Sequence, residues 1–495
     1  MPNLLNRELS QAELFLFFII ALAVFVFPVI QSDYPNYDDR ARALVFPENN
    51  WTPEGRVLTE ILVNALSFTS KTPNFFPFSY VFALPAAALA LRTLVKHYYA
   101  RCQLSDCLVV LPLFYSPFLL GILTYQYDGP AFMIGLSAVI LSVTYDSPTS
   151  GKKILVPPVM LAIGLAFHQL TFNILLGLLC IEMAEYISRG FSFRAMTQWL
   201  VKRVVHIILA LLIYGVTVYP LMSEERTAFL AFDSQWAGTV ATRLCVVYDR
   251  VALLVTSGNR WLCVGVLTGA VIGYVWTLLC ILNCKNSLKE KVALGIAYCV
   301  SMPLLLLTIP GFTLLLDYFD PAARVLLGLG PVLVGLLLFA HKFLKLLAPW
   351  TTIILMIPVL CMLSFSYMYG RVLVTQKALE DSVLHSLAYD INSRPELRKL
   401  DVIYLVQPQN SARWLPASAG VLEEIPALGY ILNKTRILAV AHFPSVGVEN
   451  VRHGQWAVFP SPAGKQQVVE NRYYDIHVLD HNGYIYMKNI IGVEH

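Results

Sequence analysis

Apolar runs about as long as a lipid bilayer is thick recur through most of this chain. A helix needs about 20 residues to cross the hydrocarbon core of a membrane. Hydrophobic residues make up 57% of the 495 residues and charged residues only 14%, about half the charged share of a typical soluble domain. The chain therefore cannot form one water-surrounded core, and we predict a polytopic α-helical membrane protein with about eleven transmembrane helices.

The predicted spans alternate with loops of very unequal length. Two connections, residues 32–76 and 223–260, are much longer than simple turns, and long loops within a compact architecture usually carry function. The spans are expected at residues 14–31, 77–95, 107–125, 130–145, 154–168, 170–187, 204–221, 261–283, 292–309, 323–341 and 346–369.

Basic residues in the loops predict the orientation of the bundle. Cytoplasmic loops are enriched in Lys and Arg. With the N-terminus in the cytoplasm, the inner loops hold fifteen such residues and the longer outer loops hold nine. An odd number of spans then places the C-terminal segment on the outer side. The basic and aromatic segment 189–203 is expected to lie on the inner leaflet as an amphipathic helix.

The composition becomes more polar after about Gly370. Residues 371–495 hold twelve basic and twelve acidic residues, so they lack the basic excess of a nucleic-acid-binding domain. We therefore divide the chain into a transmembrane domain, residues 1–370, and an outward-facing α/β domain, residues 371–495. Strands are expected at residues 400–407, 468–480 and 484–490, and a helix at residues 422–432.

The first long loop carries the densest set of charged and aromatic residues. Its sequence, QSDYPNYDDRARALVFPENNWTPEGR, places Asp33, Asp38 and Asp39 just beyond the first span and follows them with Arg40, Arg42, Trp51 and Arg56. A carboxylate can deprotonate a hydroxyl nucleophile while arginines hold a departing phosphate. Tryptophan can stack on the face of a sugar. The alternative is a solvated loop, in which these carboxylates and arginines only pair with each other or with lipid headgroups.

Further polar residues are expected at the same outer surface. Polar groups at membrane depth are costly and often functional. For two of them a structural role is the alternative: His168 as a satisfied helix-end residue, and Arg324 as the partner of Asp320 at helix spacing. The set consists of Tyr125, Gln126 and Asp128 after the third span, His168 and Gln169 after the fifth, and Arg324 at the tenth.

These residues carry a family resemblance. The stretch DYPNYDDRARALVFPENNWTPEGRVLTEILVNAL resembles the first loop of bacterial GtrII-type O-antigen glucosyltransferases, which are similar to the GT-C membrane glycosyltransferases. TYQYDGPAFMIGLS resembles the family's Tyr-x-x-Asp element and supplies Asp128. AFHQLTFNILLG resembles its Tyr-Gln element and supplies Gln169, with His168 where a tyrosine is expected. The matching residues of the first loop are Asp38, Asp39, Arg40, Trp51, Gly55 and Arg56.

The resemblance implies a polyprenyl-phosphate-linked glucose or other hexose as donor. It implies an O-antigen sugar hydroxyl of lipopolysaccharide as acceptor, at the periplasmic face of the bacterial inner membrane. In a single inverting displacement Asp39 or Asp38 would be the base, and Asp128 would assist or position sugar hydroxyls. No cofactor and no nucleic-acid partner are expected; adjacent carboxylates can bind a divalent metal, but we favour none. The residues implied to bind the donor are Arg40, Arg56 and Arg324 for its phosphate, with Trp51, Tyr125 and Gln169.

Two other classes of function are open at this point. A ligase or polymerase of lipid-linked glycans would present a similar outer face but transfer a whole glycan. A transporter or flippase for lipid-linked sugars would favour polar groups at the membrane midplane and broken helices in matched repeats. The ionisable residues of this chain gather at one surface instead, and no inverted repeat is visible.

Overall fold

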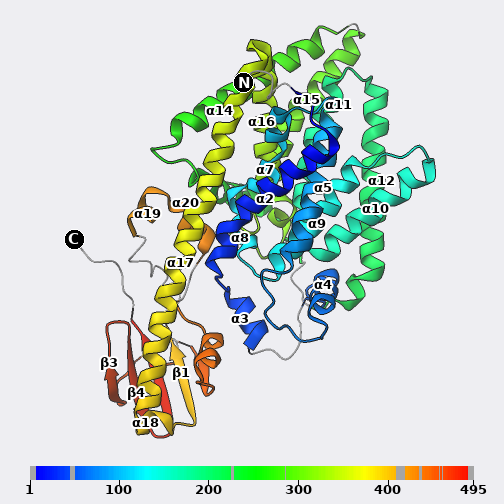
Figure 1. Ribbon diagram of the computed structural model, residues 1–495. Coiled ribbons are helices and arrows are strands. Elements are labelled where there is room, and N and C mark those ends of the chain that lie inside the picture. The colour runs from blue at the N-terminus through cyan, green and yellow to red at the C-terminus, as the bar shows by residue number, and fades with distance from the viewer. Residues whose placement is uncertain are drawn as a thin grey trace.

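A bundle of long helices is joined through one extended helix to a small sheet domain (Figure 1). Among the residues that the structure describes, nine helices are long and apolar enough to cross a membrane. The predicted class, a polytopic membrane protein, is therefore confirmed. The computed structural model describes residues 7–44, 51–223, 228–284, 286–407, 419–433, 437–455, 458–459 and 461–488.

All eleven predicted spans coincide with helical segments, and nine of them meet the length and composition of a membrane span. The other two are α5 and α9, of which α9 is apolar but only 17 residues long. The helices of the bundle are α2 (Gln11–Ser32), α5 (Tyr80–Tyr98), α6 (Leu104–Val110), α7 (Pro112–Tyr115), η1 (Pro117–Leu119), α8 (Leu120–Leu123), α9 (Asp128–Thr144), α10 (Ser150–Phe167), α11 (Thr171–Ser188), α12 (Phe193–Thr217), α14 (Arg260–Leu282), α15 (Leu288–Leu307), α16 (Leu329–Leu347) and α17 (Met356–Ser393).

Burial distinguishes the centre of the bundle from its lipid-facing rim. The third span, α6 to α8, is buried along its whole length, and the prolines at 112 and 117 divide it into short pieces. In contrast, only 17% of the apolar window of α12 and 28% of those of α14 and α15 are covered by protein. Helices that expose apolar side chains in this way need lipid around them.

The N-terminal end of α12 differs from the prediction for residues 189–203. Ser192 caps this helix by accepting a hydrogen bond from the amide of Ala195, and one continuous helix then runs through Thr217. The prediction of a separate amphipathic helix is therefore wrong. No proline or glycine separates the basic turns from the span, so the helical hydrogen bonding continues without a break.

Both long loops contain helices. The first, residues 32–76, forms α3 (Tyr37–Leu44) and α4 (Val57–Ser67), and the second, residues 223–260, forms α13 (Trp236–Ala252). Both α3 and α4 lie at the end of the bundle that faces the sheet domain (Figure 1). The acidic first loop is therefore placed between the membrane helices and the C-terminal domain.

The C-terminal domain is the mixed α/β fold expected from its strand patterns. Its five strands have the order β2-β1-β5-β4-β3; β1 is parallel to both neighbours and the remaining pairs are antiparallel. The end of α17 packs on this sheet in one hydrophobic cluster. The strands are β1 (Val402–Val406), β2 (Val451–Gly454), β3 (Gln466–Glu470), β4 (Tyr474–Leu479) and β5 (Asn482–Met487).

The structure bears on the predicted domain boundary at residue 370 in two ways. That position lies inside α17, a continuous 38-residue helix that reaches from the bundle into the sheet domain. The helix expected at residues 422–432 forms as α19 (Ala419–Glu424) and α20 (Pro426–Leu432), separated at the proline, and α20 packs into the hydrophobic core of the bundle. Chain segments from both sides of residue 370 therefore contribute to the same core.

Candidate active site

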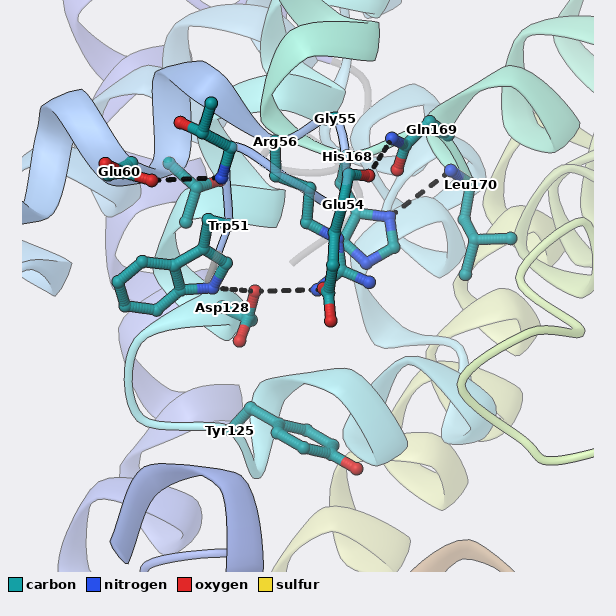
Figure 2. Close-up of polar contacts among 12 residues, drawn as sticks. Trp51, Glu54, Gly55, Arg56, Glu60, Tyr125, Asp128, His168, Gln169 and Leu170 are labelled. Atoms are coloured by element: carbon teal, nitrogen blue, oxygen red, sulfur yellow. Dashed lines mark hydrogen bonds and ion pairs between the residues drawn. The ribbon is translucent and has the colours of Figure 1, made fainter. Parts of the chain in front are cut away.

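Asp128, the first residue of α9, is the centre of a cluster of buried polar side chains (Figure 2). It is 4% exposed, and its Oδ1 atom accepts a 3.0 Å hydrogen bond from Trp51 Nε1. Arg56 Nη1 lies 3.1 Å from the same oxygen, and Arg42 Nη1 lies 3.5 Å from Oδ2. Two cations and one indole N–H thus share a single carboxylate, which offsets the cost of removing these charges from water.

The turn that carries Arg56 is held in place by Gln169, between α10 and α11, and by Tyr214 of α12. Gly55 has a φ of 77°, a left-handed conformation, and a Cβ atom there would lie 2.4 Å from Tyr214 Oη. Gln169 Nε2 donates to the carbonyl of Glu54 at 2.7 Å and to Tyr214 Oη at 3.0 Å, while the Tyr214 hydroxyl donates to the carbonyl of Gly55. Glycine is needed because no side chain fits this conformation and this contact.

Trp51 lies inside the cluster and has no exposed surface. The guanidinium of Arg42 lies 4.5 Å from the centroid of its ring, and Tyr127 meets it in an edge-to-face contact at 5.7 Å. Each contact is a favourable arrangement for an aromatic ring. The indole therefore fixes Asp128 and Arg42 in this structure.

Asp39 is 1% exposed and joins the first loop to the turn before α9. Its Oδ2 atom accepts hydrogen bonds from the amide of Asn36 at 2.9 Å and the amide of Gln126 at 3.1 Å. Its Oδ1 atom has no hydrogen-bond partner among the described residues. Burial raises the pKa of Asp39 to about 7, against the lowering effect of the two amides. A carboxyl group with such a pKa can exchange a proton near neutral pH.

Asp38 is less buried than its neighbour Asp39 and has different contacts. It is half-buried, and its carboxylate has no hydrogen bond or ion pair with any part of the chain that the structure describes. Nearby, the guanidinium of Arg324 donates a hydrogen bond to the Tyr125 hydroxyl and lies 3.8 Å from Asp320. Burial raises the pKa of Tyr125 to about 12; Arg324 lowers it, and the charge of Asp38 adds to the rise. Asp38 is therefore an unpaired carboxylate near a neutral phenol and a cation.

A small cavity of about 40 Å³ adjoins the Tyr125–Arg324 pair. Asn36 of the first loop, Tyr369 of α17 and Asn433 beyond α20 contribute to its walls. Its lining therefore combines the loop that carries Asp38, the bundle and the C-terminal segment.

Two predicted site residues face elsewhere. Arg40 is directed toward α17, where its Nη2 atom lies 3.5 Å from Asp381, so it does not join the arginines at Asp128. His168 is buried; its ring packs edge-to-face on Phe132 and its Nδ1 atom accepts a hydrogen bond from the amide of Leu170. These contacts correspond to the structural alternative for His168.

Arg42 and Gln126 were named from the sequence without a specific role for either, and Tyr214 was missed. In the structure Arg42 pairs with Asp128, and the backbone amide of Gln126 donates to Asp39. Tyr214, which holds the Gly55 turn, carries no local signal, because its role depends on a segment far away in sequence.

The described residues contain no group of three or more His, Cys, Asp or Glu side chains that could hold a metal ion. The expectation that the protein uses no cofactor stays a prediction. Chemically, the site offers two fixed arginines at Asp128, a third cation at Tyr125 and two adjacent carboxylates with different degrees of burial. Such a set can bind an anionic group and accept a proton from a hydroxyl.

The bundle and this cluster define an integral membrane protein with a group of buried polar side chains at one end of its helices. The family model described as "Glucosyl transferase GtrII" matches residues 27–335. This match covers more than half of the chain and includes every predicted site residue, so the protein belongs to the GtrII glucosyltransferase family and is a glycosyltransferase. No curated protein and no solved structure matches the chain. The family match ends before α17 and the sheet domain.

Proposed function

We propose that this protein transfers glucose from a polyprenyl-phosphate carrier to a hydroxyl of an O-antigen sugar, at the periplasmic face of the bacterial inner membrane. The observation that supports this most directly is the convergence of Arg42 and Arg56 on buried Asp128, beside an unpaired Asp38. A phosphate that leaves an anomeric carbon gains negative charge, and preorganised arginines stabilise that charge.

In this mechanism Asp38 accepts the proton of the acceptor hydroxyl. The hydroxyl oxygen forms the new bond to the anomeric carbon while the bond from that carbon to the phosphate oxygen breaks. Polyprenyl phosphate departs with the electron pair, and a single displacement inverts the configuration. Asp38 is favoured over Asp39 because no residue that the structure describes pairs with either oxygen of Asp38, whereas Asp39 is buried and held by two backbone amides.

The other residues bind or position the donor. Arg56 is 22% exposed at its side chain, so it can turn toward a phosphate, and Arg324 with the protonated Tyr125 forms a second anion-binding pair. Asp128 and Trp51 hold the arginines in place, and Gln169 holds the turn that carries Arg56. Arg40 is a weaker candidate for the phosphate because it pairs with Asp381.

The test is transfer by the purified protein in nanodiscs that contain polyprenyl-phosphate-glucose and a lipid-linked O-antigen oligosaccharide. The expected product is the acceptor with one added hexose by mass, and Asp38→Asn is expected to lose it. Addition of a whole glycan would favour a ligase or polymerase. Movement of the donor between leaflets without any product would favour a transporter and would overturn the proposal.

A further inference from the structure

A second polar pocket lies at the opposite end of the bundle from Asp128. Its walls include Val143 to Asp146 at the end of α9, whereas Asp128 begins that helix; 17 residues of helix separate them by about 25 Å. The pocket has a volume of about 250 Å³ and is also lined by the ends of α5 and α11 and the first turns of α12. It is therefore a separate feature from the candidate active site.

The carboxylates of this pocket already have cationic partners. Glu182 pairs with Arg203 at 2.5 Å and with His97 at 3.3 Å. Glu185 pairs with Lys342, and Asp146 pairs with Lys153. The acidic side chains therefore leave little uncompensated negative charge.

Two cations of the lining have no carboxylate partner among the described residues. Arg189 donates to the carbonyls of His97 and Tyr98 at the end of α5, at 3.0 and 3.1 Å. Lys202 has neither a hydrogen bond nor an ion pair with any described residue. The pocket consequently carries a net positive character that suits an anion.

Two buried polar atoms in the same pocket have no hydrogen-bond partner in the part of the chain that the structure describes. They are the hydroxyl of Tyr98, a residue 7% exposed, and Oε2 of Glu182, a residue 5% exposed. A buried polar group without a partner is costly, so such groups indicate a site that a ligand can complete. The phenol can donate to a phosphate oxygen, and the carboxylate oxygen can accept from a hydroxyl.

Stacked aromatic rings beside the pocket indicate that its ligand lies at the membrane surface. Tyr186 stacks on Phe191 with centroids 4.1 Å apart and lies nearly parallel to Trp199 at 5.9 Å. Tyrosine and tryptophan concentrate at the level of lipid headgroups. Basic pockets between membrane helices at this level bind anionic headgroups.

We propose that this pocket binds an anionic glycerophospholipid through its headgroup. Lys202, Arg189 and the Tyr98 hydroxyl contact the phosphate, and a headgroup hydroxyl donates to Glu182. The lipid then fastens α5, α9, α11 and α12 together at the end of the bundle farthest from the transfer site. This inference does not depend on which sugar is transferred.

The test uses the full-length protein in nanodiscs of equal parts phosphatidylglycerol and phosphatidylcholine, followed by native mass spectrometry of retained lipid. The wild type is expected to retain phosphatidylglycerol. The double variant R189Q/K202Q is expected to weaken retention roughly thirtyfold, because each cation near an anionic lipid contributes about a factor of five. Arg194→Gln is the matched control, since Arg194 is exposed on the same helix and does not line the pocket.

Arg189 also supports the end of α5, so the double variant can lose its fold. Two single variants, Lys202→Gln and Tyr98→Phe, keep the test valid. Each is expected to reduce retention severalfold without lowering the melting temperature measured in the absence of anionic lipid. Soluble glycerol phosphate is the second ligand probe. Equal retention by all variants, or displacement of the lipid by millimolar glycerol phosphate, would overturn the proposal; in the latter case the pocket takes a free phosphate ester.

Discussion

The hydroxyl of Tyr34, just beyond the first membrane helix, donates a 2.9 Å hydrogen bond to the fully buried carboxylate of Glu380 in α17. Gln376 donates to the same carboxylate oxygen at 2.6 Å, and Nε2 of His442, in η6 (Val440–Val446), lies 3.5 Å from the other. One turn away, Lys377 binds Asp33. The loop that carries the candidate base is thus attached to α17 and the C-terminal domain.

Glu380→Ala is expected to destabilise the protein by about 3–5 kcal/mol, because it leaves buried partners without their shared acceptor. It is also expected to reduce transfer, since Asp38 lies only four residues from Tyr34. Thermal unfolding in detergent and the hexose-transfer assay measure the two effects. Glu396→Gln, at an exposed position beyond α17, serves as the control. An unchanged melting temperature for Glu380→Ala would contradict this role.

Asp38→Asn is expected to reduce the rate of transfer by a factor of about 10² to 10⁴, the usual contribution of a general base. Donor binding and thermal stability should change little, because this carboxylate has no partner among the described residues to lose. Asp33→Asn removes a charge paired with Lys377 but keeps an oxygen that can accept from the Gln126 side chain, so it is expected to keep most activity. If Asp38→Asn turns over normally, the base is another residue, and Asp39 is the next candidate.

The raised pKa of Asp39 predicts that the stability of the folded protein depends on pH. Its pKa is about 7 in the folded protein, above the ordinary value of 3.8, so the folded state retains a proton that the unfolded state has released. The free energy of unfolding contributed by this group is therefore greatest below pH 4 and declines as pH rises to about 7, by up to about 4 kcal/mol.

The measurement is thermal unfolding from pH 4.5 to 8 for the wild type and Asp39→Asn. The variant is expected to show a flatter profile, because an amide keeps an acceptor for the two backbone amides but does not titrate. Identical slopes would show that Asp39 does not titrate in this range. A transfer rate that rises through pH 7 only in the wild type would assign the base to Asp39.

Asp128→Ala removes the carboxylate shared by Arg42, Arg56 and Trp51. Buried Arg42 then loses its ion-pair partner, whereas Arg56 keeps Glu54 at 3.3 Å. We expect a loss of about 3–5 kcal/mol in unfolding free energy, together with a loss of donor binding. Asp128→Asn keeps an acceptor for the Trp51 indole but not the charge, so its effect should be smaller. Thermal unfolding and binding of the lipid-linked donor test both, and equal stability of wild type and Asp128→Ala would exclude the structural role.

Gly55→Ala is expected to lower transfer at least tenfold. The new Cβ atom would lie 2.4 Å from Tyr214 Oη and 2.6 Å from Gln169 Nε2 at a φ of 77°, so the turn must move and carry Arg56 with it. Gly215→Ala on α12, where a Cβ atom meets nothing within 4 Å, is the matched control. Both variants are compared by transfer rate and donor affinity; equal rates would show that the turn tolerates the shift.

The sequence alone predicted the membrane class, the positions of the eleven helical segments and the strands β1, β4 and β5 of the C-terminal domain. These follow from local patterns: the length of an apolar run, and the alternation of apolar and polar residues within a strand. It also located the charged first loop and Asp128, because adjacent carboxylates and arginines at a helix end are visible without knowledge of the fold. The continuity of α12 through residues 193–203 was predicted wrongly. The single strand expected at residues 468–480 spans the end of β3 and all of β4, and β2 was not predicted.

Only the tertiary structure determines which charged residue takes which role. Asp38 and Asp39 are adjacent in sequence, yet the amide of Gln126, 87 residues away, holds Asp39 and leaves Asp38 unpaired. Arg40 and Arg42 lie two residues apart, yet one faces Asp381 and the other faces Asp128. A side chain's burial and partners depend on which distant segments pack against it, and no local pattern contains that information.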